Sequence, residues 1–196
     1  NRNSGIFLSN ADWNTFFNNT CNLHSSSGIA ASSADYNIFI GNILENNDRA
    51  GIDISSSISN TLSNNIMNNN GISISGSSSI RWDSHSIDNT NIVNGKPVYY
   101  WKNKNGGKVP AGAGQIIIVK SNGVVVDNQN LSNSSYGVLL AYSNGITVSN
   151  TTTNGNYVGI KLYWSQINII ENNICLSNMY SGISLEYSDS SILYNN

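Results

Sequence analysis

The sequence predicts an all-β fold, a right-handed parallel β-helix (solenoid) of about eight or nine turns with three short strands per turn. The first observation is a glycine that recurs every 20 to 23 residues, with one interval of 43 that spans two periods: Gly5, Gly28, Gly51, Gly71, Gly114, Gly137, Gly159 and Gly182. The second is an asparagine fourteen residues after most of these glycines: Asn19, Asn42, Asn65, Asn128, Asn173 and Asn196. A fixed period in the twenties indicates one supersecondary unit that is stacked many times.

Each turn is expected to begin with a strand directly after its glycine. Apolar residues stand one and three positions after it, as in Ile29 and Ala31 or Ile52 and Ile54, whereas the residue between them varies. This alternation is typical of a strand with one buried face. The first strand of each turn therefore supplies one wall of the solenoid.

Two shorter strands are expected to complete the turn. One lies near the tenth to twelfth residues after the glycine, as in 38–40 and 124–126, and the other follows the asparagine, as in 42–44 and 173–175. Each strand would pair with its copy in the next turn, about 4.8 Å away. Asparagine suits the corners between strands because it tolerates left-handed backbone, and stacked asparagine side chains can bond one another along the axis.

The two cysteines fall in the core of this repeat. Cys21 and Cys175 each lie sixteen residues after a glycine, which predicts the same buried column as Leu44, Met67 and Ile87. Because the two cysteines are several turns apart, they are expected to be free thiols rather than a disulfide.

Residues 88–114 interrupt the repeat and are predicted to form an inserted loop or hairpin. Both prolines of the chain, Pro97 and Pro110, fall here together with four lysines. Residues 97–101 are expected to be extended and residues 103–107 to turn. Two interpretations stay open: the insertion belongs to a binding face, or it replaces one turn and packs its aromatic residues for stability.

Composition bounds the function. The 36 Asn and 32 Ser of 196 residues would alone suggest disorder, but the periodicity places the few apolar residues where each turn needs them. A net charge of −2 argues against nucleic acid as a partner, and no apolar run approaches the roughly 20 residues of a membrane span.

No cofactor and no metal site are expected, because Cys and His lack ligand spacing. The chain is interpreted as a single β-helix domain, residues 1–196, of a longer protein, with neighbouring domains of the same chain as partners.

Four runs carry a resemblance to a known family: residues 94–101, 112–119, 128–132 and 136–143. They resemble the β-helix repeat family that is named after the periplasmic copper-enzyme maturation protein NosD and is abundant in archaeal surface proteins. The resemblance implies a link to carbohydrate-binding and sugar-hydrolase β-helices, and some relatives are secreted depolymerases of the disaggregatase type. It implies an extracellular or cell-surface location and a polysaccharide, a cell-envelope glycan, as partner. It transfers no catalytic residue.

Aromatic residues gather on the outward positions of the late turns, and they are the candidate substrate-binding residues. Rings in a row beside charged groups suit sugars, which offer flat apolar faces ringed by hydroxyls. An alternative is that the rings decorate a solenoid surface without any ligand. The predicted substrate-binding residues are Tyr100, Trp101, Tyr142, Lys161, Tyr163, Trp164 and Tyr187.

The candidate catalytic residues are Asp83, His85, Asp88 and Glu186. Hydrolysis of a glycosidic bond needs two carboxylates roughly 5–10 Å apart, whereas a lyase needs a base and a cation. Asp83 and His85 would share one face if they lie in a strand. The alternative is that both merely cap a turn by hydrogen bonding.

The sequence thus favours a polysaccharide-interacting module of an exported cell-surface protein. The module is interpreted as part of a polysaccharide-cleaving enzyme, a glycoside hydrolase or polysaccharide lyase. The second hypothesis is a structural spacer of the cell envelope, in which the solenoid supplies length.

Overall fold

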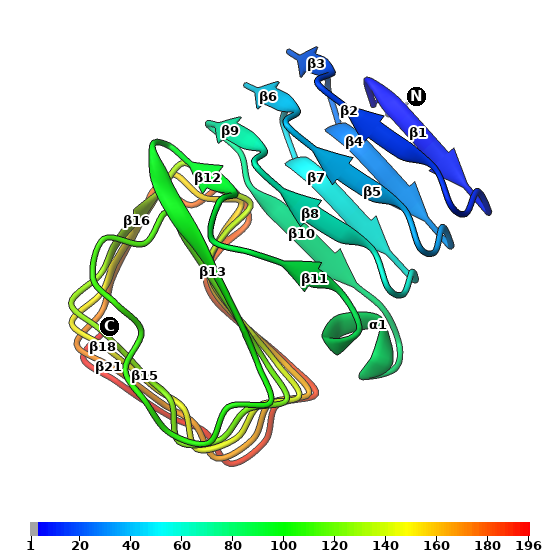
Figure 1. Ribbon diagram of the computed structural model, residues 1–196. Helices are drawn as coiled ribbons and strands as arrows, with labels where there is room; N and C mark the ends of the chain where they lie inside the picture. The colour runs from blue at the N-terminus through cyan, green and yellow to red at the C-terminus, as the bar shows by residue number, and fades with distance from the viewer. Residues whose placement is uncertain (1–3) are drawn as a thin grey trace. The chain divides into compact units, whose positions relative to one another are not determined.

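The computed structural model describes residues 4–196, which form two compact units. We call them the N-terminal unit, up to Val98, and the C-terminal unit, from Tyr99 onwards. Each is a coil of parallel strands (Figure 1). Together they supply about eight turns, so the predicted parallel β-helix is confirmed.

The N-terminal unit has three walls of parallel strands. The first wall is β1 (Ile6–Ser9), β4 (Ser27–Ser32), β7 (Ala50–Ser55) and β10 (Ile72–Ser75). The second is β2 (Thr15–Phe17), β5 (Ile38–Ile40), β8 (Thr61–Ser63) and β11 (Ser86–Ile87), and the third is β3 (Thr20–Asn22), β6 (Ile43–Glu45), β9 (Ile66–Asn68) and β12 (Ile92–Val93). Equivalent residues of successive turns pair directly, as Ile29 does with Ile52.

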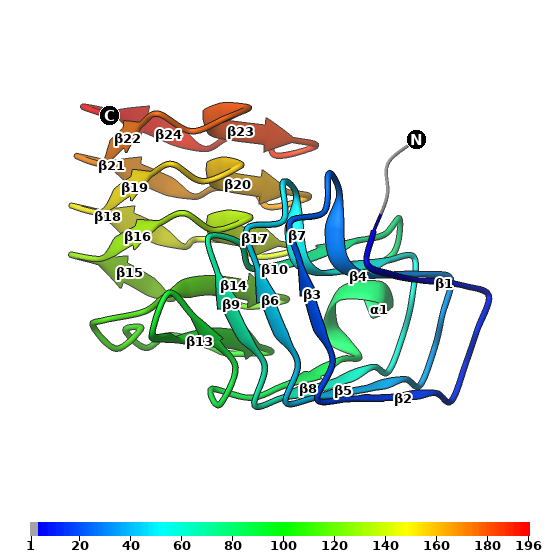
Figure 2. The ribbon, with the colours of Figure 1, turned by 90° about the horizontal axis from the view of Figure 1, so that it is seen from above.

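The C-terminal unit repeats this plan, and its turns form regular layers in Figure 2. Its first wall is β14 (Gln115–Val119), β17 (Tyr136–Ala141), β20 (Val158–Tyr163) and β23 (Ser181–Glu186). The second is β15 (Val125–Asp127), β18 (Thr147–Ser149), β21 (Ile169–Glu171) and β24 (Ile192–Tyr194), and the third is β16 (Asn130–Ser132), β19 (Thr152–Asn154) and β22 (Ile174–Leu176).

The core of each turn is built from a few inward residues. In the first wall they lie one and three positions after the glycine, as Ile52 and Ile54 do with no exposed surface. In the second wall only the middle residue of each strand faces inward, such as Phe39 in β5, while its neighbours stay partly exposed. Stacking joins these small contributions into one apolar column per wall.

Columns of asparagine hold the corners. The Oδ1 atom of Asn42 accepts hydrogen bonds from the backbone N–H and the side-chain amide of Asn19, at 3.0 and 2.9 Å, and its own amide donates to Asn65 at 2.9 Å. The predicted side-chain ladder is therefore present. Further corners use the same device, because Asn37 accepts from the N–H of Asn14 at 2.8 Å.

The repeat frame of the C-terminal unit differs from the prediction by one residue at its start. Ile116 pairs with Val138, so Gln115 and not Gly114 is the equivalent of Gly137. The ladder residue of that turn is accordingly Gln129, whose N–H donates to Thr151 at 3.3 Å, and not the predicted Asn128.

The interruption of the repeat begins before the insertion. Asp83 and His85 do not share the face of a strand, because Asp83 ends a short helix, α1 (Ile80–Asp83). The extra residues lengthen this turn, so that Ile87 pairs with Leu62 and not, as predicted, with Met67. Val93 takes the predicted place of Ile87 beside Met67.

Residues 88–114 contain a hairpin. Strand β13 (Lys96–Lys102) runs antiparallel to β12, and the two are joined by Asn94 and Gly95, both with positive φ. Such a two-residue connection matches the twist of antiparallel strands. The chain then runs parallel to the first turn of the C-terminal unit, where Lys108 bridges Val125.

Candidate functional site

Three aromatic residues occupy one corner column of the C-terminal unit, directly after its first wall. Tyr142, Trp164 and Tyr187 each have φ near +50°. The N–H groups of Tyr142 and Trp164 donate along the axis, to the carbonyls of Tyr163 and Glu186 at 2.9 and 3.0 Å. Because left-handed backbone is costly for a residue with a bulky side chain, its recurrence here shows that the surrounding turns dictate the conformation. We call these three residues the C-terminal ladder.

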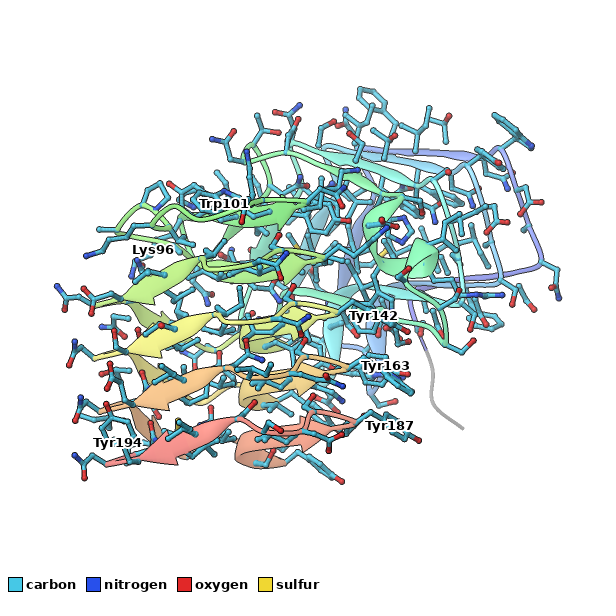
Figure 3. All side chains as sticks on the ribbon, turned by 90° about the horizontal axis from the view of Figure 1, so that it is seen from below. Lys96, Trp101, Tyr142, Tyr163, Tyr187 and Tyr194 are labelled. Carbon is cyan, nitrogen blue, oxygen red and sulfur yellow. The ribbon has the colours of Figure 1, made fainter. Side chains whose placement is uncertain are left out.

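The rings of the C-terminal ladder stack along the solenoid axis. Tyr142 and Trp164 lie 6.4 Å apart between ring centroids with planes 3° apart, and Trp164 and Tyr187 lie 4.8 Å apart with planes 17° apart. Tyr163 meets Tyr142 and Tyr187 edge to face, at 6.0 Å each. Figure 3 shows Tyr142, Tyr163 and Tyr187 in successive turns along one edge of the unit. Trp164 is 45% and Tyr187 64% exposed.

Charged residues border the ladder. Lys161 Nζ contacts Glu186 Oε1 at 2.7 Å and lies 6.0 Å from the ring centroid of Tyr136. Lys120 precedes Tyr142 in the ladder column, since it also has positive φ and donates its N–H to Ala141 at 3.0 Å. A repeat counted from Gly114 misses Lys120, whereas a repeat counted from Gln115 places it in this column.

The sequence-predicted residues of the insertion lie apart from the ladder column along the chain, on β13. Trp101 and Tyr99 pack against the buried core of the C-terminal unit. Tyr100 points to the other side of this strand, where Lys102 Nζ lies 5.8 Å from its ring. The packing of Trp101 favours the interpretation that the insertion stabilises the end of a core.

His85 takes the place of an asparagine in a corner column of the N-terminal unit. Its Nδ1 accepts the N–H of Asn60 at 3.2 Å, in the position that Asn60 takes towards Asn37, and its Nε2 lies 3.0 Å from the carbonyl of Arg81. The ring has no exposed surface. Because both nitrogens are engaged, the geometry gives His85 a structural role and leaves neither nitrogen facing a substrate.

The acids named with His85 are not gathered around an open site. Asp88 accepts hydrogen bonds from Thr90 and Asn91 within its own turn. Asp83 lies at the end of α1. Glu186 is the one candidate that borders the ladder, and there it is paired with Lys161.

The most strongly perturbed carboxyl is Asp127, which the sequence analysis gave no role. Hydrogen bonds from Lys108 at 2.9 Å, Asn150 at 2.8 Å and Ser149 at 3.0 Å lower its pKa to about 2. A carboxylate held ionised in this way is a poor general acid. Its hydrogen bonds with Ser149 and Asn150 join two successive turns, which gives Asp127 a structural role.

Soft metal donors are dispersed. Among residues 4–196 no three His, Cys, Asp or Glu side chains come together as a metal site. Both cysteines are free, as predicted, and burial raises the pKa of Cys21 and of Cys175. A copper ion would need such donors close together, so the described residues do not fit one.

Comparison with known families gives one match. A family model described as periplasmic copper-binding protein (NosD) matches the chain twice, over residues 1–106 and over residues 97–196. No curated protein sequence and no solved structure matches the chain. Within the described part of the chain, no helix is both long and apolar enough to cross a membrane.

Proposed function

The chain belongs to the NosD family, and from that membership we propose that it is an envelope β-helix module that binds polysaccharide along the C-terminal ladder. The family description names a periplasmic protein, which supports a location outside the cytoplasm. The observation that carries the proposal is the exposed column of Tyr142, Trp164 and Tyr187, with Lys161 and Glu186 beside it.

The arrangement and exposure of the three rings bear on how a glycan would contact this column. The rings of Tyr142 and Trp164 lie nearly parallel, and Trp164 is also nearly parallel to Tyr187. Tyr187 is the most exposed ring of the three. A sugar ring would stack on the exposed ring of Tyr187, while Lys161, Glu186 and Lys120 would exchange hydrogen bonds with hydroxyl or acidic groups of the polymer.

We further propose that the module is part of a polysaccharide-cleaving enzyme, a glycosidase or lyase of the disaggregatase type from an archaeal surface. Glu186 would then supply a catalytic carboxylate, since it is the candidate that borders the ladder. Within the N-terminal unit, His85 and Asp88 are both engaged in local hydrogen bonds. Binding therefore stands on more observations than cleavage does.

The copper in the family description does not extend to this chain in our proposal. Met67 and Cys21 face the core of the N-terminal unit, and His85 has both nitrogens engaged. The chemistry of copper binding needs several soft donors around one point, and no step of the proposed function uses a metal.

A structural spacer is the second candidate function, and one observation favours it. The face-to-face stacking of the ladder rings is itself a stabilising arrangement, worth about 0.5–1.5 kcal/mol per pair. Rings that only stabilise the column would need no glycan. The two functions are separated by measuring binding.

Replacing Tyr187 by alanine is expected to weaken glycan binding about tenfold, the effect of removing one exposed aromatic anchor. The measurement is a screen of the full chain on immobilised envelope polysaccharides, with the affinity of each hit determined by calorimetry. Release of reducing ends, measured in parallel with Glu186→Gln, tests cleavage.

The matched control is Tyr180→Ala, which removes a similarly exposed tyrosine that stacks on Tyr157 at 5.7 Å before β23. This variant should bind as the unchanged protein does. If the unchanged protein ignores every polysaccharide in the screen, the module is a spacer and the proposal fails.

A further inference from the structure

A second aromatic stack lies on the N-terminal unit, at a corner that neither the sequence analysis nor the family match singles out. Trp13 and Tyr36 lie 4.3 Å apart between ring centroids with planes 2° apart. Trp13 is 74% and Tyr36 39% exposed. These rings are closer and more nearly parallel than the stacked rings of the C-terminal ladder.

The fold does not require rings at this corner. Trp13, Tyr36 and Ser59 hold equivalent places in three successive turns, and all three have φ between +55° and +61°. The chain thus closes the same corner with a serine. Left-handed backbone costs more for a tryptophan than for a small residue, so a large, mostly exposed ring here calls for a role beyond closing the turn.

Two carboxylates flank the stack. Asp12 and Asp35 directly precede Trp13 and Tyr36. One oxygen of each is held by backbone: Asp12 Oδ1 accepts the N–H of Asp35 at 2.7 Å, and Asp35 Oδ1 accepts the N–H of Ile58 at 2.8 Å. These bonds fix the two carboxyl groups, which belong to the residues next to Trp13 and Tyr36 in the chain.

We infer that Trp13, Tyr36, Asp12 and Asp35 form a second saccharide-binding site, which takes a neutral sugar residue and rejects uronates. The apolar face of the sugar would lie on the exposed ring of Trp13, and its hydroxyls would donate to Asp12. Two carboxylates repel an acidic sugar. The inference rests on the proposed function for its ligand class, but it concerns a different unit and the opposite charge preference from a ladder bordered by Lys120 and Lys161.

Calorimetry on the full chain tests the site with two probes, a neutral β-linked glucose hexamer and a galacturonate hexamer. Trp13→Ala is expected to weaken binding of the neutral hexamer about tenfold, while Tyr187→Ala leaves it unchanged. Phe17→Ala is the matched control, because it removes another exposed ring from the same turn, and it should have no effect.

Asp12→Asn tests the charge preference without loss of the backbone contact, because an amide oxygen can still accept the N–H of Asp35. Combined with Tyr187→Ala, it should raise galacturonate binding about tenfold relative to Tyr187→Ala alone. The inference is overturned if Trp13→Ala binds the neutral hexamer like the unchanged protein, if Tyr187→Ala abolishes that binding, or if Asp12→Asn changes nothing. Binding of galacturonate through Tyr187 with no binding of the neutral hexamer would overturn this site and leave the proposed function standing.

Discussion

Replacing Asn65 by leucine is expected to destabilise the N-terminal unit by about 3–5 kcal/mol. Asn65 has no exposed surface, and its Oδ1 accepts the N–H of Asn42 at 3.0 Å while its amide donates to the carbonyl of Phe39 at 2.9 Å. It also bonds the side chains of Asn42 and Asn91. Leucine has a similar size but no polar atoms, so buried backbone groups lose their partners at about 1–3 kcal/mol each.

The measurement is native-state hydrogen exchange of the amides of β5, β8 and β9, which reports on this unit separately from the other. Asn68→Ala is the control, because Asn68 is half-buried and its amide donates to Glu45 at the surface. It should cost less than about 1 kcal/mol. If Asn65→Leu lowers the free energy of unfolding by less than about 1 kcal/mol, the column of asparagine side chains does not hold the corner.

Replacing Gly137 by alanine is expected to destabilise the C-terminal unit by about 2–4 kcal/mol. A Cβ atom at this position would lie 2.7 Å from the carbonyl oxygen of Gly159 in the next turn and 2.9 Å from Thr153 Cγ2. The first contact is with backbone, which moves only if the paired strands β17 and β20 separate. Overpacking of this kind typically costs about 1–3 kcal/mol and more when backbone must shift.

Gly182→Ala is the control from the same column, in the last described turn. Its Cβ would meet the side chain of Cys175 at 3.0 Å, and the nearest backbone atom at 3.7 Å. Its cost should be about 1 kcal/mol or less. Thermal unfolding and hydrogen exchange of both variants would check the order, and equal costs would contradict a stack in which each glycine touches the next turn.

The glycine spacing predicted the strands because each turn must bring its first wall close to its neighbour. The same spacing misplaced the start of the C-terminal unit, where Gln115 holds the glycine position. The lengthened turn around α1 could not be seen in the sequence either, since Ile87 fits the apolar pattern in both frames.

The candidate site was predicted in part. The sequence placed Tyr142, Trp164 and Tyr187 at equivalent positions, and the structure brings them into one column. It could not show that their rings stack on one another, because stacking depends on side-chain rotamers. It also could not show that His85 takes the place of an asparagine, since an imidazole nitrogen accepts the same N–H.

Every proposal here depends on residues about 22 apart being neighbours along the axis, and a pair of engineered cysteines tests this directly. Ser32 and Ser55 are register partners in β4 and β7, so their Cα atoms lie about 5 Å apart, within the range that a disulfide bridges. With Cys21 and Cys175 replaced by alanine, Ser32→Cys combined with Ser55→Cys should oxidise to an intramolecular disulfide. Ser32→Cys combined with Ser75→Cys, two turns apart, should stay reduced. The opposite pattern would contradict the stacked turns and everything built on them.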